Sequence, residues 1–349
     1  RQGIVQDLNR NAMLGTLSHT RRLCYPLDKT SKSIGPRKLH NSQWGFVCPT
    51  ESPDGGNVGI INHLSIIAKV TTNISEEGIK ECLNDINILL IEDSIVEDLY
   101  DKTKIFLNGR IYGLYLNPSF LYKYLKLLKL NSIININTSI SWDIKSSEFH
   151  IFTDSGRIIR PVFYLKKDKD GNKYNELINK DYSYIETWSK AIHGLMYNEP
   201  DVDVSVYDNI YHKDILDDIK KKNDYMRYLE ENAACIEYID SIESENAFIA
   251  KDIYSAYDPE KNYSHSEIHS SLMLSALSVN IPFSNHSQYP RNVFSCQQTK
   301  QAVGVYSSAF NARFDIMGHI LHYPQKPIIT TRFKKYTDVD KLPYGINAV

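Results

Sequence analysis

The sequence lacks the cysteine patterns that organise disulfide-rich or zinc-binding domains. It has 349 residues, and its five cysteines are Cys24, Cys48, Cys82, Cys235 and Cys296. Their number is odd, their spacing is wide, and no two form a Cys-x-x-Cys pair. These features argue against a disulfide framework and a zinc ribbon, and they favour a reducing compartment.

The sequence also lacks a long apolar run. No stretch approaches the ~18 consecutive apolar residues that a membrane-spanning helix requires, so we expect no membrane partner. The first residues are too polar for a secretory signal, the chain does not begin with Met, and it stops on a rising apolar run. We therefore expect a fragment. Its composition, 42% hydrophobic and 23% charged, is that of two or three folded domains.

Common catalytic motifs are missing as well. The glycine-rich residues 55–59 have no following Gly-Lys-Ser/Thr, so a tight turn before a buried strand is favoured over a P-loop. No Gly-x-Ser-x-Gly motif occurs. His265 and His269, four positions apart, could bind a metal from one face of a helix, but Glu267 does not fit the zincin pattern. Buried polar anchors at a helix start are the favoured interpretation, and a metal hydrolase is a minor alternative.

Charge is distributed unevenly along the chain, although the net charge is only −2. Residues 1–40 carry eight Lys and Arg against two Asp and Glu, and residues 291–349 carry eight against three. Residues 201–260 carry six against sixteen. Basic clusters attract phosphate backbones, so the two basic ends could bind nucleic acid. A solvated charged surface would explain the same pattern.

Local patterns predict mixed helices and strands. Asn108-Gly109 between β-prone runs predicts a hairpin with a type I′ turn, and Asn117-Pro118 predicts the start of an amphipathic helix. The other expected elements are a helix over 4–23, a buried strand within 60–70, a hairpin over 148–165, helices over 184–196 and 214–231, a strand over 235–239 and an acidic turn over 241–246.

Residues 287–301 form the strongest candidate cluster for ligand binding. Pro290 restricts the backbone before Arg291, whose guanidinium could hold a phosphate with two hydrogen bonds. Four polar side chains on the following helix would line one face, namely Gln297, Gln298, Lys300 and Gln301. By itself this pattern is a moderate indication of a nucleotide or phosphate contact, and an exposed Arg without a ligand is the simpler alternative.

At this point several motifs, in order and suitably spaced, resemble one family. They are TLSHTRR at 16–22, HNSQWGFVCPTESPDG at 40–55, HSEIH at 265–269, IPF at 281–283, PRN at 290–292, KQAVGV at 300–305 and YPQKP at 323–327. Together they resemble the second-largest subunit of multi-subunit DNA-directed RNA polymerases. Trp44 and the Pro-Arg-Asn block resemble the eukaryotic, archaeal and giant-virus branch more than the bacterial one.

The resemblance implies a multi-domain α+β fold. Residues 1–95 would be the C-terminal part of a fork domain, 96–166 the first external domain and 167–252 the second. Residues 253–349 would begin a hybrid-binding domain. The fork would lie over the active-site cleft, with the loop 27–35 near the point of DNA strand separation.

The resemblance also implies residue roles. Arg291 matches the arginine that reaches the incoming ribonucleoside triphosphate. The nucleic-acid contacts implied for the DNA template and the RNA–DNA hybrid involve Arg1, Gln6, Arg22, Asp54, Lys300 and Gln301. Asp54 stands where the family usually has Glu, Phe294 replaces a Tyr, and Gln298-Thr299 replaces Met-Gly. These departures concern the geometry beside the nucleotide.

Catalytic residues are not expected within this chain. In the resembling family the catalytic Mg²⁺ is held mainly by the largest subunit, which would be a partner together with other polymerase subunits. We therefore expect template-dependent RNA synthesis only by the complex, in the nucleus or, for a virus, in the virion or host cell. A non-catalytic nucleic-acid-binding scaffold, derived from a polymerase subunit, is the alternative.

Overall fold

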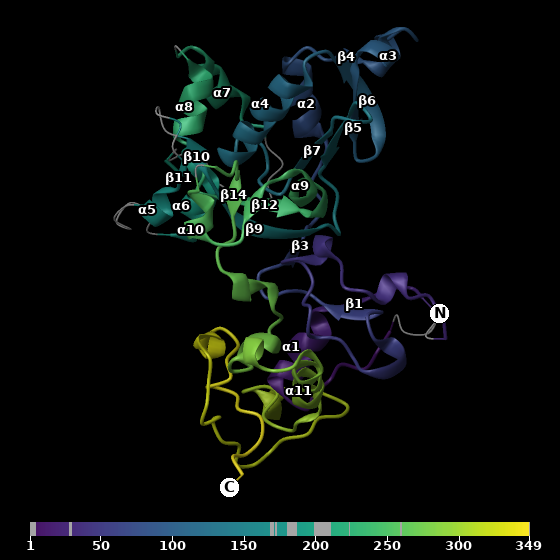
Figure 1. Ribbon diagram of the computed structural model, residues 1–349, viewed down its shortest axis with the longest axis vertical. Helices are drawn as coiled ribbons and strands as arrows, with labels where there is room; N and C mark the ends of the chain where they lie inside the picture. Colours follow the sequence, from purple (N-terminus) through teal and green to yellow (C-terminus); the bar gives the residue numbers. More distant parts are fainter. Residues whose placement is uncertain are drawn as a thin grey trace. The chain divides into compact units, whose positions relative to one another are not determined.

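The computed structural model describes residues 5–27, 30–167, 171, 173–179, 187–198, 211–222, 224–258 and 260–348. The chain divides into two compact units (Figure 1). Unit 1 comprises Arg1–Ala68 and Ser271–Val349, and unit 2 comprises Lys69–Ser270. Both contain helices and strands, which confirms the predicted α+β class. The bounds of the four predicted domains stay predictions. No helix in the described ranges is both long and apolar enough to span a membrane.

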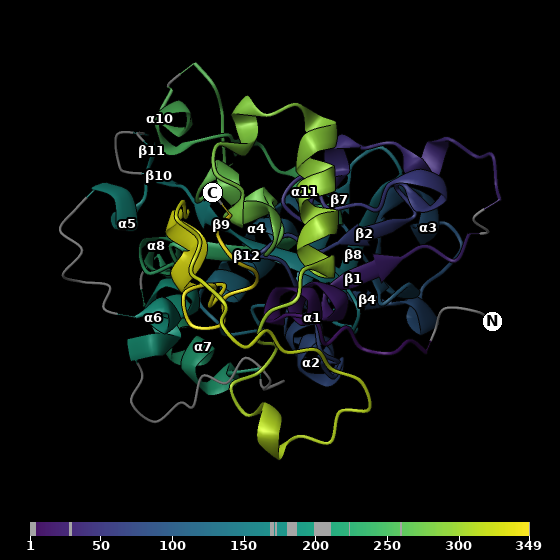
Figure 2. The same ribbon diagram turned by 90° about the horizontal axis from the view of Figure 1, so that it is seen from below.

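Unit 1 is built around two helices and one short pair of strands. Its elements are α1 (Met13–Thr20), β1 (Arg22–Cys24), η1 (Gly35–Arg37), η2 (Asn41–Gln43), η3 (Gly55–Asn57), β2 (Ile61–His63), η8 (Ser278–Asn280), η9 (Ser284–His286), α11 (Tyr289–Gln301), η10 (Phe310–Ala312) and η11 (Arg332–Lys335), with η7 (Ser270–Met273) at its border with unit 2. Leu14 of α1 and Cys296 of α11 share a buried core with Leu277 and Val339, and Figure 2 shows α1 beside α11. This core joins the two sequence segments of the unit.

The first helix is much shorter than the sequence predicted. The expected helix over 4–23 is wrong for residues 5–12 and 21–23, because α1 covers only Met13–Thr20 of the described residues. Asn9 prevents an earlier start, because its side-chain oxygen accepts a hydrogen bond from Asn11 N and its backbone oxygen accepts one from the Thr16 hydroxyl. At the other end the chain enters β1, which pairs antiparallel with β2. The buried strand expected within 60–70 is likewise shorter, since β2 ends at His63.

The two segments of unit 1 also meet where the chain leaves for unit 2 and returns from it. The Ile66 N–H donates to the Leu274 carbonyl at 2.7 Å. Arg21 closes the same turn by donating from Nη2 to the carbonyls of Ser65, at 2.5 Å, and Ala68, at 2.9 Å. The Ile66–Leu274 bond joins the departing and the returning segments within unit 1, and the Arg21 bonds fix the departing one.

Unit 2 contains two five-stranded sheets. The first has the order β4-β6-β5-β8-β7, with β5 and β8 parallel, and the second has the order β12-β9-β14-β13, with β3 also on β9. The strands are β3 (Lys69–Val70), β4 (Leu89–Leu90), β5 (Thr103–Leu107), β6 (Arg110–Tyr115), β7 (Ser139–Asp143), β8 (Glu148–Phe152), β9 (Ile158–Tyr164), β12 (Ile236–Asp240), β13 (Ile249–Ala250) and β14 (His265–Ser266), beside a separate pair β10 (Lys166–Lys167) and β11 (Lys173–Tyr174).

The helices of unit 2 supply much of its main hydrophobic core. They are α2 (Glu77–Asp85), η4 (Ile91–Asp93), α3 (Asp98–Asp101), α4 (Pro118–Leu130), α5 (Glu176–Asn179), α6 (Trp188–His193), η6 (Gly194–Asn198), α7 (Lys213–Lys220), α8 (Tyr225–Glu231), α9 (Ser241–Asn246) and α10 (Ile253–Ala256). Buried residues of α2, α4, α7 and α8 pack with the first sheet, Leu121, Leu128 and Phe149 among them. This packing fixes the position of α4, which carries Lys126 and Lys129.

Two local predictions in unit 2 are confirmed. Asn108 and Gly109 both have positive φ, 47° and 81°, in the turn between β5 and β6, as a type I′ turn requires. Asn117 accepts a hydrogen bond from Phe120 N at 3.2 Å and caps α4, with Pro118 in its first turn.

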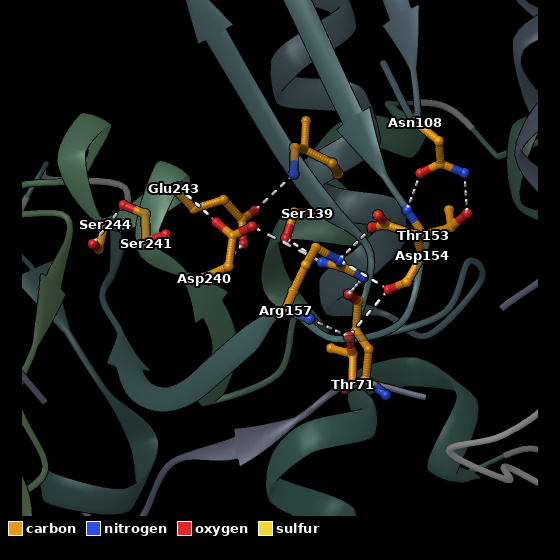
Figure 3. Close-up of polar contacts among 12 residues, drawn as sticks. Thr71, Asn108, Ser139, Thr153, Asp154, Arg157, Asp240, Ser241, Glu243 and Ser244 are labelled. Carbon is orange, nitrogen blue, oxygen red and sulfur yellow. Dashed lines mark hydrogen bonds and ion pairs between the residues drawn. The ribbon is translucent and has the colours of Figure 1, made fainter. Parts of the chain in front are cut away.

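The predicted hairpin over 148–165 is wrong, because its two strands belong to different sheets. β8 pairs with β5 and β7, whereas β9 pairs with β12, β14 and β3. Figure 3 shows the cause at the turn between them. The Arg157 guanidinium donates to the Ser139 hydroxyl at 2.5 Å and to the Asn137 carbonyl at 2.9 Å, and Arg157 N donates to the Thr71 hydroxyl. These contacts with distant segments lead the chain out of the first sheet.

Residues 211–246 also differ in part from the expectation. The strand β12 is confirmed, but the acidic turn expected over 241–246 is the helix α9. Asp240 accepts from Glu243 N at 2.8 Å while the Glu243 side chain accepts from Asp240 N, so a capping box starts this helix. The helix expected over 214–231 is two helices, α7 and α8, and part of the one expected over 184–196 lies outside the described residues.

Candidate nucleic-acid interface

The pairing of β1 with β2 places Arg22 directly opposite His63. Arg22 Nη1 donates to Gln6 Oε1 at 3.2 Å, and His19 Nε2, at the end of α1, lies 3.0 Å from the same oxygen. The structure therefore brings together two residues, Gln6 and Arg22, that the resemblance assigns to nucleic-acid contacts. It adds His19, to which no role was assigned.

His19 has a defined tautomer in this arrangement. Its Nδ1 accepts the backbone N–H of Asn9 at 3.2 Å, so the ring proton is on Nε2 and is donated to Gln6. Burial, together with the charges of Arg22 and Lys300, lowers the pKa of His19. The imidazole is therefore neutral at pH 7 and orients Gln6 without adding positive charge.

Lys300 lies near the C-terminal end of α11 and points to a buried carboxylate. Its Nζ is 2.9 Å from Glu51 Oε1 and 3.2 Å from His63 Nε2, and the Lys300 side chain is 16% exposed. The Asn9 side chain donates to the Lys300 carbonyl at 3.1 Å and fixes this end of the helix. The Lys300 side chain is thus partly exposed, and its ammonium is held from within the fold.

Glu51 is 1% exposed and needs partners to carry a charge. Burial alone would raise its pKa, but His63, Lys300 and the hydroxyls of Ser18 and Ser275 outweigh burial, and the pKa is lowered. The Ser18 hydroxyl donates to Oε1 at 2.5 Å. Glu51 is therefore an ionised carboxylate at neutral pH.

His63 completes this group as a neutral acceptor. Its Nδ1 lies 3.0 Å from the Glu51 backbone carbonyl, which can only accept, so Nδ1 carries the proton. Burial lowers the pKa of His63 to about 4; the Glu51 charge opposes this shift, and Lys300 and Arg22 reinforce it. The unprotonated Nε2 accepts a hydrogen bond from the Lys300 ammonium.

We call these six residues the basic cluster: Gln6, His19, Arg22, Glu51, His63 and Lys300. At neutral pH it contains two fixed cations and one buried carboxylate, so its net charge is positive. A partly exposed Arg beside a partly exposed Lys can bind phosphate oxygens by charge-assisted hydrogen bonds. The two cations of the cluster can neutralise phosphate charge. Its histidines are neutral and add no charge, and its one carboxylate is already paired with Lys300.

Arg291 lies on another face of α11. Arg291, Phe294, Gln298 and Gln301 are all exposed and lie three, four and three positions apart, so they form one stripe. The Arg291 guanidinium lies 5.8 Å from the centre of the Phe294 ring. Lys300 follows Arg291 by nine positions, about two and a half turns, and so points to the opposite side. The expectation that Gln297, Gln298, Lys300 and Gln301 all line one face is wrong, because Gln298 and Gln301 are exposed whereas Lys300 contacts the buried Glu51.

Asp54 and the loop 27–35 are placed by local contacts. Asp54 Oδ1 accepts from Gly55 N at 2.8 Å and caps η3, so residues 55–57 form a turn before β2, as predicted. Arg37 donates to the carbonyls of Gly56 and Val58, and from Nη2 to Ser31, tying part of the loop 27–35 to this turn. Residues 28–29 of the loop, and Arg1, lie outside the described residues.

The metal interpretation of His265 and His269 is not supported. His265 lies in β14 rather than on a helix, and its Nε2 donates to Glu237 Oε2 at 2.9 Å. Within the described part of the chain, no three His, Cys, Asp or Glu side chains are grouped closely enough to hold a metal ion.

Sequence reasoning missed the roles of Glu51, His63 and Ser18. Glu51 and Ser18 lie within motifs that carried the resemblance, yet nothing local indicates that they meet Lys300, which is far away in sequence. A lone His inside an apolar run was the only available signal for His63.

Three family models match the chain. RNA polymerase Rpb2 domain 3 matches residues 6–70, domain 4 matches 105–166 and domain 6 matches 277–349. The first and third of these segments together form most of unit 1, which contains the basic cluster. These matches define the class as a subunit of a multi-subunit RNA polymerase.

Curated relatives agree along the whole chain. DNA-directed RNA polymerase II subunit 2 of Arabidopsis thaliana is 33% identical over 357 residues, covering 100% of this chain and 27% of the relative. Subunit 2 of the RNA polymerase of Acanthamoeba polyphaga mimivirus is 31% identical over 353 residues, covering 100% and 28%. Rpo2 of Sulfolobus acidocaldarius is 28% identical, with the same coverage. The chain belongs to the family of second-largest RNA polymerase subunits and spans less than a third of the length of these relatives.

Proposed function

We propose that this chain lines the active-site cleft of a DNA-directed RNA polymerase that makes RNA from ribonucleoside triphosphates on a DNA template. The observation that carries the proposal is the basic cluster. It gathers Gln6, Arg22 and Lys300 from two segments that each match a different Rpb2 domain. The partners would be the largest subunit and the other polymerase subunits.

Within this proposal the basic cluster contacts the phosphates of the DNA template and the RNA–DNA hybrid. Arg22 lies opposite His63 on the paired strand, and Lys300 contacts His63 through its ammonium. Gln301 adds an exposed amide at the end of α11. A rigid cation beside each phosphate would position the nucleic acid without reading its sequence.

Arg291 would bind the triphosphate of the incoming nucleotide. It is exposed on the first turn of α11, and its guanidinium carbon lies 5.8 Å from the centre of the Phe294 ring. A guanidinium on an aromatic ring can still bind phosphate oxygens in pairs through its N–H groups. Phosphoryl transfer depends on positioning and on neutralising charge, both of which Arg291 can supply.

The catalytic Mg²⁺ would be held by the largest subunit. The described residues of this chain do not fit that ion, since they form no group of metal ligands. Their contribution is to bind and orient nucleic acid and nucleotide. The relatives named above belong to eukaryotes, a giant virus and an archaeon, and we propose a nuclear site of action, or the virion and host cell for a virus.

A non-catalytic scaffold would use the same basic cluster for binding alone. The experiment that separates the two functions is single-nucleotide addition by the reconstituted enzyme carrying Arg291→Ala. Incorporation efficiency should fall roughly 30- to 1000-fold, corresponding to about 2–4 kcal/mol of transition-state stabilisation. Arg291→Lys should restore only part of it, because an ammonium cannot form the paired contact.

The matched control is Arg110→Ala, which removes an exposed arginine of unit 2. It should leave incorporation unchanged. DNA affinity should barely change in either variant. A wild-type enzyme that binds DNA but incorporates no nucleotide would favour the scaffold, and normal incorporation by Arg291→Ala would refute the assignment of Arg291.

A further inference from the structure

We propose that Glu51 and His63 are positioning residues that hold the Lys300 ammonium in place for a phosphate of the nucleic acid. This inference rests on the proposed function, because it needs a phosphate opposite Lys300. It goes beyond that function by assigning a task to two buried side chains that have no access to the ligand themselves.

The hydrogen bonds of the Lys300 ammonium carry the argument. An ammonium has three N–H groups. One is directed to Glu51 Oε1 at 2.9 Å and a second to His63 Nε2 at 3.2 Å. Both acceptors are 1% exposed, whereas the Lys300 side chain is 16% exposed. One N–H is therefore left for a phosphate oxygen, and its direction follows from the two bonds inside the fold.

His63 can take this part only as a neutral ring with its proton on Nδ1. The Glu51 backbone carbonyl fixes that tautomer. A protonated ring would present a second N–H to the Lys300 ammonium and repel it. The charged groups that face His63 are Glu51, Lys300 and Arg22. Burial, with the two cations, lowers the pKa of His63 and favours the neutral ring against the Glu51 charge.

Glu51 is itself held from several sides. Ser18 of α1 donates to its Oε1 at 2.5 Å, and Ser275 also hydrogen-bonds to the carboxylate. The carboxylate therefore joins α1 and α11 at one point. A lysine side chain has much rotational freedom, and fixing it before the ligand arrives removes an entropic cost from binding.

The test is a double-mutant cycle in the reconstituted polymerase, with single-nucleotide addition and RNA–DNA hybrid affinity as readouts. Lys300→Ala and Glu51→Gln should each lower incorporation efficiency, by roughly tenfold. The double variant should be no worse than Lys300→Ala, because Glu51 acts through Lys300. Glu51→Asp should restore part of the loss. Lys123→Ala, at an exposed ion pair of unit 2, is the control and should be neutral.

A second measurement guards against a folding defect. In the assembled enzyme the Lys300 amine should react slowly with an acylating reagent, and Glu51→Gln or His63→Leu should accelerate its modification severalfold while other lysines react as before. Unchanged reactivity of Lys300 would overturn the proposal, and so would losses that add up in the double variant. An inactive wild-type enzyme, or a normal Lys300→Ala enzyme, would instead refute the proposed function or its use of Lys300.

Discussion

Both units bury carboxylates beside a lysine and a histidine, but they use them differently. In unit 2, Lys126 and Lys129 of α4 face Glu237 and Glu243, with Lys126 Nζ 2.6 Å and Lys129 Nζ 2.9 Å from the Glu243 carboxylate. His265 Nε2 donates to Glu237 Oε2 at 2.9 Å. Two cations and two anions balance, and nearly all of this network is buried.

The balance keeps the network of unit 2 ionised. Burial alone would raise the pKa of Glu237, but Lys126, Lys129 and His265 outweigh it and lower the pKa well below its ordinary value. Burial likewise opposes the charge on Lys126, yet Glu237 and Glu243 raise its pKa. Glu243 also accepts from Ile140 N at 3.0 Å. The network therefore joins β7, α4, β12 and α9 and has a structural function.

The basic cluster of unit 1 has one carboxylate for two fixed cations. Arg22 donates to a neutral amide, and Lys300 shares Glu51 with a neutral imidazole. Its net positive charge is carried by Arg22 and Lys300, whose side chains are partly exposed. The comparison shows that a buried ion pair alone does not indicate function. What distinguishes the two groups is whether the charges balance and whether a cation retains an unused donor.

The largest effect that would test this comparison is expected from Lys129→Met. It removes a fully buried cation and leaves Lys126 as the one lysine that faces both Glu243 and Glu237 in this network. We expect the free energy of unfolding to fall by about 3–5 kcal/mol, measured by denaturant titration. The matched control is Lys123→Met on the same helix, whose ion pair with Glu230 is about half exposed and should contribute under ~1 kcal/mol. Equal losses would show that the network is not a structural centre.

The next effect concerns pH and unit 1. The folded-state pKa of His63 is about 4, below its ordinary value of 6.5. Between these two pH values the unfolded chain binds a proton at His63 that the folded chain does not bind. Stability is therefore complete above pH 6.5 and is lost as the pH falls toward 4, by roughly 3 kcal/mol. Unfolding titrations of His63→Gln should lack this loss. If the variant and the wild type show the same pH dependence, His63 is not the neutral acceptor described above.

The smallest effect concerns the charge that each unit offers to nucleic acid. In the assembled enzyme, Arg22→Ala should lower the log–log salt slope of duplex DNA binding by about 1, since one phosphate contact is lost. Lys123→Ala, in unit 2, should leave the slope unchanged. Fluorescence titrations from low to high salt measure both. If Lys123→Ala lowers the salt slope more than Arg22→Ala does, unit 2 rather than the basic cluster of unit 1 supplies the phosphate contact.

Elements with a strong local signal could be predicted from the sequence. The turn at Asn108-Gly109 and the cap at Asn117 depend on residues within four positions of each other, and both are confirmed. The split between β8 and β9 could not be predicted, because it depends on contacts of Arg157 with Thr71 and with residues 137–139.

The candidate site divides in the same way. The resemblance selected Gln6, Arg22 and Lys300, and the structure brings them to one cluster. The expectation of one shared polar face on α11 is wrong at Lys300, because its amine contacts a carboxylate 249 positions earlier. Only the folded chain shows that partner.

The bond between Ile66 and Leu274 has a consequence for how the chain folds. Unit 2 is an insertion of about 200 residues between the halves of unit 1, and its own contacts lie within one continuous stretch. On the ribosome, unit 2 can therefore fold as soon as it emerges, while Leu14 must wait for Cys296. Closing so long a loop costs chain entropy, and a folded insertion that holds its ends together lowers this cost. Because unit 2 is synthesised before the second segment of unit 1, its folding can lower the entropic cost of joining the two segments that form the basic cluster.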